Sequence, residues 1–159
     1  MLNTYTVSFF GHRLINDFFT VEKELRKLIA HLLRTQTYIE FLVGRNGEFD
    51  QLVSSEIRRA KKEYRNDNCT HTLVLPYSTA LLRNNYDSFK SYYDQIDIYD
   101  NLYKVHFKNA IKMRNKLMVD NSNLIIFYLE HEYGGAYQTY KYAVKQGKKT
   151  IILPNNNIY

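Results

Sequence analysis

The sequence predicts an α/β fold: a three-layer, Rossmann-like domain with a mostly parallel sheet of about five strands. Short apolar runs alternate with amphipathic segments along the chain, which is the pattern of strand–helix–strand units with right-handed crossovers. Two of the apolar runs, at 38–43 and 124–128, lead through glycine-bearing turns into helical segments. Such turns bring backbone N–H groups and a helix N-terminus to one place, which favours an anion, most often phosphate.

The first half of the chain supplies three strands and two helices. A β-rich run at 4–10 stops at Gly11, and Asp17 is the expected N-cap of the helix that follows. In that helix the apolar residues recur at three- and four-residue spacing: Val21, Leu25, Leu28, Ile29 and Leu32. Residues 38–43 are predicted to form a buried strand, 48–65 a helix, and 70–75 a third strand closed by Pro76.

The second half continues the alternation after an interruption. We expect a helix at about 105–118, a strand at 123–128, a helix at 136–146 and a strand at 150–153. Gly147 is the expected left-handed residue after the last helix. The tyrosine-rich stretch at 77–104 fits the alternation poorly, and a connection of this length is usually a lid, a binding loop or a small excursion. Residues 1–159 are otherwise expected to form a single domain.

Composition and charge indicate the cellular compartment and the class of protein. The formal charge is +6, but basic residues such as Arg58, Arg59, Lys61 and Lys62 lie beside Glu56 and Glu63, which is typical of a solvated face. No apolar run approaches the roughly 20 residues of a membrane span, and no signal peptide is visible. The single cysteine, Cys69, has no intramolecular partner for a disulfide. We expect a cytoplasmic protein without membrane association.

Four short motifs carry a family resemblance. Residues 7–13 read VSFFGHR, 44–50 read GRNGEFD, 114–122 read RNKLMVDNS, and 132–136 read EYGGA. In this order they resemble the SLOG superfamily of Rossmann-like domains, which includes the YpsA-like (DUF1273) proteins, the DNA-processing protein DprA and the LOG phosphoribohydrolases. The resemblance implies a nucleotide or nucleotide-derived ligand at the C-terminal ends of the parallel strands, and a homodimer.

The candidate site follows from these motifs. The predicted ligand- and phosphate-binding residues are Gly11, His12, Arg13, Gly44, Arg45, Asn46, Gly47, Asp50, Arg114, Asn115, Gly134, Gly135, Ala136 and Thr139. Glycines permit close backbone approach or positive φ, although each also fits a plain tight turn. Arginine forks to phosphate, while Arg114 also suits a structural salt bridge. Asp50 suits either a ribose hydroxyl or a helix cap. The tyrosine-rich 77–104 segment is expected to cover the base.

The sequence does not decide whether the protein is an enzyme, but the residues at the expected catalytic position are unfavourable for catalysis. The glutamate of the phosphoribohydrolase motif falls on Lys141, and the chain has no acidic residue between Ala136 and Gly147. Cleavage of a glycosidic bond needs a carboxylate near the anomeric carbon, so Glu48, Glu56, Glu130 or Glu132 would have to be delivered by loops. The histidines lack zinc-site spacing, and we expect neither a metal nor a cofactor.

Three hypotheses remain. The preferred one is a binder of a nucleotide-derived small molecule, acting as a sensor, sponge or regulatory module, with nucleotide signalling as a context by analogy. The second is an N-glycosidic hydrolase or transferase with a displaced glutamate. The third is a DprA-like binder of single-stranded nucleic acid, which the net charge and fifteen tyrosines support and the lack of a concentrated basic stripe weakens.

Overall fold

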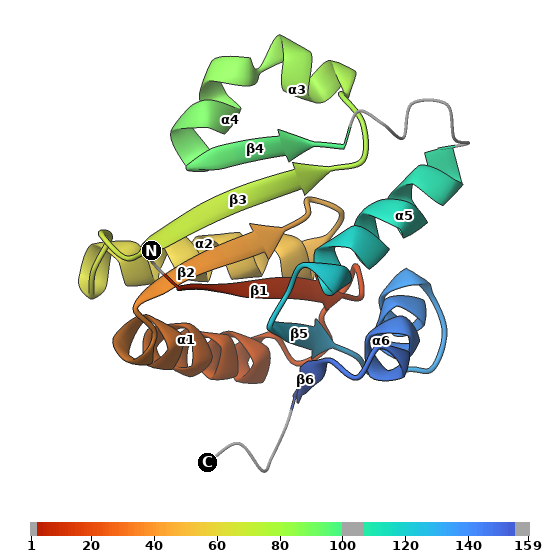
Figure 1. The fold of residues 1–159 in the computed structure, drawn as a ribbon, viewed down its shortest axis with the longest axis horizontal. Coiled ribbons are helices and arrows are strands. Elements are labelled where there is room, and N and C mark those ends of the chain that lie inside the picture. The colour runs from red at the N-terminus through yellow and green to blue at the C-terminus, as the bar shows by residue number, and fades with distance from the viewer. Residues whose placement is uncertain (1–2, 100–106, 155–159) are drawn as a thin grey trace.

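The computed structural model describes residues 3–99 and 107–154. One sheet holds β1 (Thr4–Gly11), β2 (Tyr38–Val43), β3 (Cys69–Leu75), β4 (Gln95–Ile98), β5 (Leu124–Tyr128) and β6 (Lys149–Leu153). The helices are α1 (Phe18–Thr35), α2 (Glu48–Glu63), α3 (Ala80–Asn84), α4 (Tyr86–Tyr92), α5 (Phe107–Asp120) and α6 (Gly135–Lys145). The predicted three-layer α/β architecture is confirmed (Figure 1).

The strand order explains where a ligand can enter. The sheet runs β4-β3-β2-β1-β5-β6, and every neighbouring pair is parallel. The chain builds outward from β1 through β2, β3 and β4, then returns to the other side of β1 for β5 and β6 (Figure 1). The direction of winding therefore reverses between β1 and β5. In open parallel sheets the crevice at this switch point, outside the carboxyl ends of the strands, is where ligands bind.

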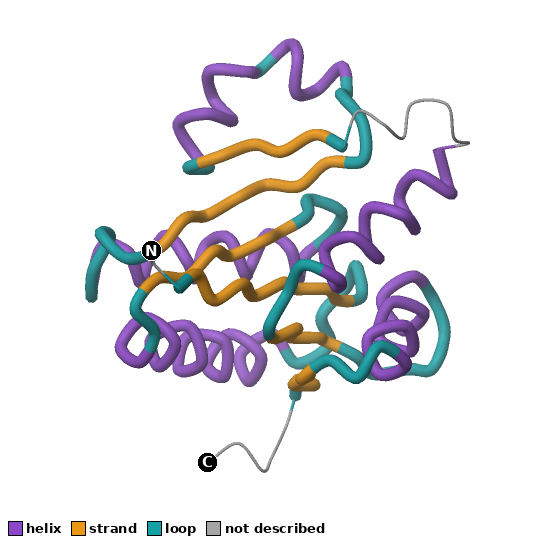
Figure 2. The backbone as a smooth tube through the Cα atoms, viewed as in Figure 1, coloured by secondary structure: helices purple, strands orange, loops and turns teal. Residues whose placement is uncertain are grey.

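Alternating side chains divide the core between the two faces of the sheet. Val7 and Phe9 of β1 face the side covered by α1 and α2, whereas Phe10 faces the side covered by α5 and α6. Both helical layers lie against the sheet in the backbone view (Figure 2). Met118 of α5 and Ala143 of α6 are fully buried in the second layer. This packing places the N-terminus of α6 and the middle of α5 beside the switch point.

Predictions that depend on residues close together in the sequence agree with the structure. The side chain of Asp17 accepts a hydrogen bond from Thr20 N at 3.2 Å, so it caps α1 as predicted. Gly147 has φ +71°, the left-handed conformation expected after α6. Cys69 is buried and free. The helix expected at 105–118 extends to Asp120, and its first two predicted residues lie outside the described part.

The prediction of about five strands missed β4. Four residues long, β4 lies at an edge of the sheet, with Gln95 and Asp97 among its four side chains, so it lacks the apolar run that marks the other strands. Asp94 sets its register, because its backbone N–H donates to His71 O and its carboxylate accepts from His71 N, both at 2.9 Å. Most of the expected excursion is therefore α3, α4 and an added strand; residues 100–104 lie outside the described part.

Candidate functional site

A cavity of about 370 Å³ opens at the carboxyl ends of β1 and β5. Its lining comes from all four sequence motifs: Phe10, Gly11, His12, Arg13, Asn46, Asp50, Ile111, Arg114, Asn115, His131, Tyr133, Gly134, Gly135 and Ala136. Most of the predicted binding residues are thus brought together from distant parts of the chain. A larger cavity, of about 790 Å³, lies at the amino ends of the strands and is lined by none of them.

The N-terminus of α6 forms one wall of this cavity. Gly134 is its N-cap with φ +93°, a conformation that favours glycine, and it has no side chain with which to cap the helix. The first N–H groups of an α-helix have no intrahelical acceptor and carry the positive end of the helix dipole. A Cβ built on Gly135 meets nothing within 4 Å. The first turn of α6 thus has no side-chain cap and lines a cavity with free space beside Gly135, where an anion can be accommodated.

Two other glycines serve close packing. A Cβ on Gly11 would lie 2.4 Å from Phe49 Cδ2, and one on Gly47 would lie 2.6 Å from Arg13 Cα. Glu48 N also donates to Arg13 O at 2.8 Å. The turn after β1 is therefore pressed onto the start of α2, and this contact holds Arg13, an exposed residue, at the rim of the cavity.

Arg114 reaches the cavity from inside the protein. Its residue is 4% exposed, and its Nη1 donates to Val74 O at 3.2 Å. Nε and Nη2 both donate to Asn115 Oδ1, at 3.1 and 2.8 Å. Gly44 lies against the same group, because a Cβ there would be 3.2 Å from Arg114 Nη1. A guanidinium held on several sides is preorganised to receive an anion.

Thr139 forms hydrogen bonds that connect the residues of the site to each other. Its hydroxyl donates to Gly135 O at 2.8 Å and accepts from Asn115 Nδ2 at 3.2 Å. Thr139 is buried and does not line the cavity. Its role is to connect Asn115, and through it Arg114, to the first turn of α6.

Asp50 is the carboxylate that lines the cavity within the described residues. Its Oδ2 accepts from Asn46 N at 2.8 Å. Burial raises the pKa of Asp50, while the Asn46 hydrogen bond and the charge of Arg114 act in the opposite direction. Burial likewise lowers the pKa of Arg114, against the effect of Asp50. The cavity lining thus combines two arginines, Arg13 and Arg114, with one carboxylate.

Three aromatic rings form a stack at the mouth of the cavity. The rings of His12 and His131 lie 3.5 Å apart at 13°, and those of His131 and Tyr133 lie 3.7 Å apart at 17°. His131 N donates to His12 Nε2 at 3.4 Å. Burial, followed by the neighbouring His131, lowers the pKa of His12. Sequence reasoning found His12 but missed His131 and Tyr133; their place just before the Gly134–Gly135 turn was the available signal.

Arg45 is turned away from this cavity. Its guanidinium lies 4.6 Å from the Phe89 ring centroid, and its Nη1 donates to Tyr93 Oη at 3.2 Å. Similarly, the guanidinium carbon of Arg58 lies over the Tyr92 ring, 4.2 Å from the ring centroid. Contrary to expectation, these tyrosines of the 77–104 segment pack against α2 and do not line the cavity. Tyr103 lies outside the described residues.

Three of the four glutamates considered for catalysis, Glu48, Glu56 and Glu130, have other partners. Glu48 Oε2 accepts from Ile15 N at 2.8 Å, and Glu56 accepts two hydrogen bonds of 3.0 Å from Arg26. Glu130 Oε2 accepts a hydrogen bond from Asn16 Nδ2. Neither these residues nor Glu132 line the cavity.

Comparison with solved structures identifies the architecture. DNA processing protein A from Helicobacter pylori, described with a single-stranded DNA binding mode, superposes with a TM-score of 0.67 over 97% of this chain, at 16% identity. DNA processing protein A (DprA) from Streptococcus pneumoniae gives 0.68 over 98%, at 13% identity. The fold is DprA-like.

This chain spans 67% of the first DprA chain and 52% of the second. No family model matches the sequence, and no curated protein matches it. At these identities the likeness concerns the Rossmann-type fold alone.

Proposed function

We propose that the cavity between β1 and β5 binds the phosphate of a nucleotide or nucleotide-derived ligand, and that the protein acts as a sensor, sponge or regulatory module. The observation that carries the proposal is the uncapped N-terminus of α6 at Gly134 and Gly135, which faces open space beside Arg13 and Arg114. Helix N-termini and paired guanidinium groups are the usual ligands of protein-bound phosphate. The motif resemblance to YpsA-like SLOG domains supports the same ligand class.

Mass spectrometry tests this proposal directly. The purified protein is incubated with a panel of nucleotides, cyclic nucleotides and ADP-ribose derivatives, and the bound molecules are released by denaturation. A stoichiometric intact ligand supports a binder, whereas free base with ribose phosphate supports a glycosidic enzyme. If neither a bound ligand nor cleavage products are recovered, the proposal is contradicted.

A variant pair locates the site. Gly135→Phe puts a ring into the open space beside the α6 N-terminus without a steric conflict for its Cβ, and we expect binding to be lost while the protein stays folded. Gln138→Phe places the same ring on an exposed position of the same helix and serves as the control. Equal ligand affinity in the two variants would place the site elsewhere.

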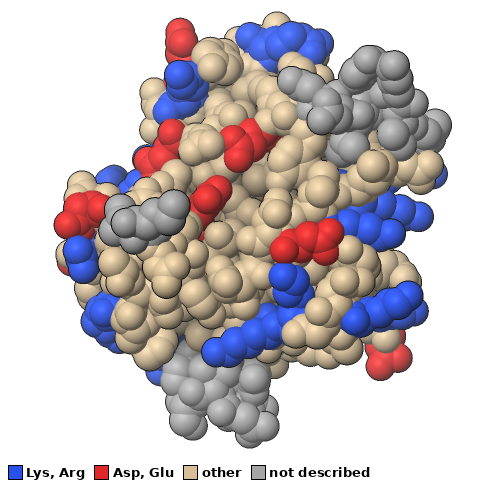
Figure 3. Space-filling model, in the orientation of Figure 1, with Lys and Arg blue, Asp and Glu red and all other residues tan. Residues whose placement is uncertain are grey.

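A second candidate function is binding of single-stranded nucleic acid, favoured by a basic face next to the cavity. Lys and Arg side chains gather over α5 and α6 (Figure 3). The exposed lysines of these two helices are Lys108, Lys112, Lys116, Lys141 and Lys145. Lys116 lies 5.3 Å from the Tyr142 ring centroid and Lys141 lies 5.8 Å from that of Tyr137. Lysines among aromatic rings are typical of surfaces that bind single-stranded nucleic acid along its length.

Salt dependence separates the two candidates. An oligonucleotide that crosses the α5–α6 face makes several phosphate contacts, and its affinity then falls steeply with salt, by a logarithmic slope of about −0.7 per contact. A single nucleotide in the cavity gives a shallow slope. Oligonucleotide binding no tighter than mononucleotide binding would contradict the second candidate.

Assembly and location are also proposals. We propose a homodimer in the cytoplasm, and light scattering after size-exclusion chromatography gives the mass that checks the assembly. Within residues 3–99 and 107–154, none of the helices combines the length and apolar character needed to cross a membrane.

A further inference from the structure

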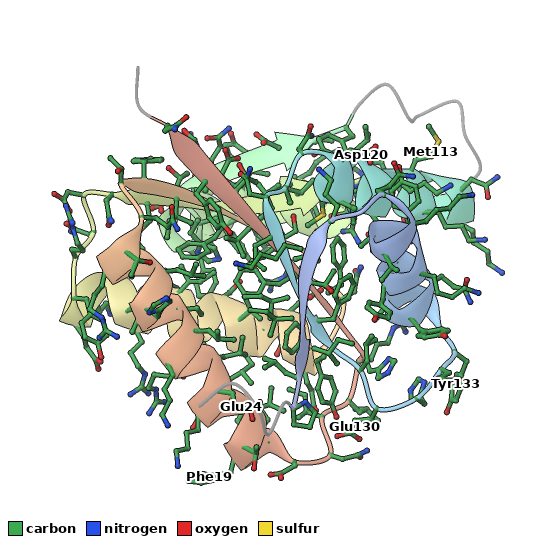
Figure 4. The ribbon with its side chains drawn as sticks, turned by 60° about the horizontal axis from the view of Figure 1, so that its bottom comes forward. Phe19, Glu24, Met113, Asp120, Glu130 and Tyr133 are labelled. Carbon is green, nitrogen blue, oxygen red and sulfur yellow. The ribbon has the colours of Figure 1, made fainter. Side chains whose placement is uncertain are left out.

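Tyr133 combines an ordered ring with an open face. Its ring is stacked on His131 at 3.7 Å, which covers one side, yet the residue is 68% exposed. The other face of the ring therefore looks into solvent. Figure 4 shows Tyr133 at the outer edge of the loop that leads into α6.

The stack beneath Tyr133 keeps this ring in place. His131 is itself stacked on His12, whose ring meets Tyr128 edge-on at 5.8 Å between centroids. Tyr128 is fully buried in β5. The exposed ring is thus supported through two imidazoles by the core, so little side-chain entropy is lost when another planar group stacks on it.

The position of Tyr133 relative to the phosphate site is set by the chain. Two peptide units separate it from Gly135, so the two Cα atoms lie at most about 7.6 Å apart. Both residues line the same cavity. A group that stacks on Tyr133 and a phosphate at the α6 N-terminus are therefore within reach of a single small molecule.

We propose that the outer face of Tyr133 is the platform on which the ligand's nucleobase stacks while its phosphate occupies the α6 N-terminus. The inference rests on the proposed function and names the ligand class within it: a nucleotide with an aromatic base. Every base has a π-face, so stacking tolerates different bases. We expect purines to bind more tightly than pyrimidines because they cover more of the ring, with weak discrimination between adenine and guanine.

The test compares ligands with and without a base. Binding of AMP, CMP and ribose 5-phosphate is measured by titration calorimetry for the wild type, Tyr133→Ala and Tyr133→Phe. Removal of a stacking ring typically costs about 5- to 150-fold in affinity. We expect that loss for AMP with Tyr133→Ala, near-wild-type binding with Tyr133→Phe, and no change for ribose 5-phosphate in either variant.

A matched control is Tyr86→Ala. Tyr86 is 50% exposed and lies on α4, away from the cavity, so its loss should leave AMP binding unchanged. An equal loss of AMP and ribose 5-phosphate in Tyr133→Ala would mean that the ring merely holds the loop, and would overturn the inference. Wild-type AMP binding that survives Tyr133→Ala would also overturn it while leaving the phosphate site intact. A wild type that binds none of the three ligands would instead contradict the proposed function.

Discussion

His71 Nε2 lies 2.9 Å from Ser54 Oγ, joining β3 to α2 inside the protein. Both residues are about 1% exposed. His71 Nδ1 is buried without a hydrogen-bond partner among the described residues. Burial lowers the pKa of His71 to about 4, and Lys61 and Arg58 act in the same direction, against Asp94. The pair is a structural contact that favours the neutral imidazole.

This contact predicts a pH-dependent stability. A histidine whose folded pKa lies below its unfolded value contributes stability that is present above the unfolded pKa, near 6.5, and is lost as pH falls toward about 4. At about 1.4 kcal/mol per pKa unit, the loss is roughly 3 kcal/mol. Urea unfolding across this range should show a steeper decline for the wild type than for His71→Gln. His31→Gln, at an exposed histidine, should follow the wild type, and identical curves for all three proteins would refute the prediction.

Gly11 is expected to be sensitive to substitution because of Phe49. A Cβ at Gly11 would lie 2.4 Å from the Phe49 ring, and overpacking of this kind costs about 1–3 kcal/mol. We expect Gly11→Ala to lower the free energy of unfolding by that amount, and by less in a Phe49→Leu background. Gly135→Ala, with open space around its Cβ, should not destabilise the protein. Denaturant titration measures all four variants; additive effects of Gly11→Ala and Phe49→Leu would show that the two residues do not interact.

Asp50 should weaken anion binding at the cavity. Asp50→Asn retains an oxygen to accept the hydrogen bond from Asn46 N and removes a negative charge from a wall shared with Arg13 and Arg114. We expect the affinity for inorganic phosphate to rise several-fold, since like charges repel across the cavity. Phosphate is the appropriate probe because it carries no ribose hydroxyl for Asp50 to hold. An unchanged or lower affinity in calorimetry would place the anion away from Asp50.

Anion binding should strengthen as pH falls. Burial and the charge of His131 lower the pKa of His12 in the free protein, while the hydrogen bond with the His131 backbone and the charge of Glu130 raise it. Arg13, Asp50 and Tyr133 also line the cavity. A bound anion favours the imidazolium and raises that pKa. The added affinity is therefore complete below the free-state pKa and disappears as pH rises through the bound-state pKa.

Sulfate is a suitable probe of this linkage, because its charge is constant between about pH 5 and pH 8, where histidine titrates. Titrations of the wild type should show a several-fold rise in affinity toward acid pH. His12→Asn should flatten the profile, and His31→Asn should not. A flat wild-type profile would show that His12 takes up no proton on binding.

Elements with a strong local pattern were predictable. The apolar spacing and Asp17 cap of α1, the apolar run of β2 and the Gly147 C-terminal turn all appear as expected. Their signals depend on residues within a few positions of each other. β4 was missed because its pairing depends on Asp94 and His71, which are distant in the sequence and give no local apolar pattern.

The sequence by itself determined the alternation of β1, β2, β3, β5 and β6 with α1, α2, α5 and α6, and the four motifs that converge at the switch point, because hydrophobic periodicity and glycine turns act locally. Only the tertiary structure decided the direction of individual side chains. Arg45 follows β2 but turns to Phe89 and Tyr93, while Arg114 is buried against Val74 O. The stack of His12, His131 and Tyr133 likewise exists because parallel pairing brings β1 and β5 side by side. Contacts between residues more than a hundred positions apart depend on packing, which no local pattern records.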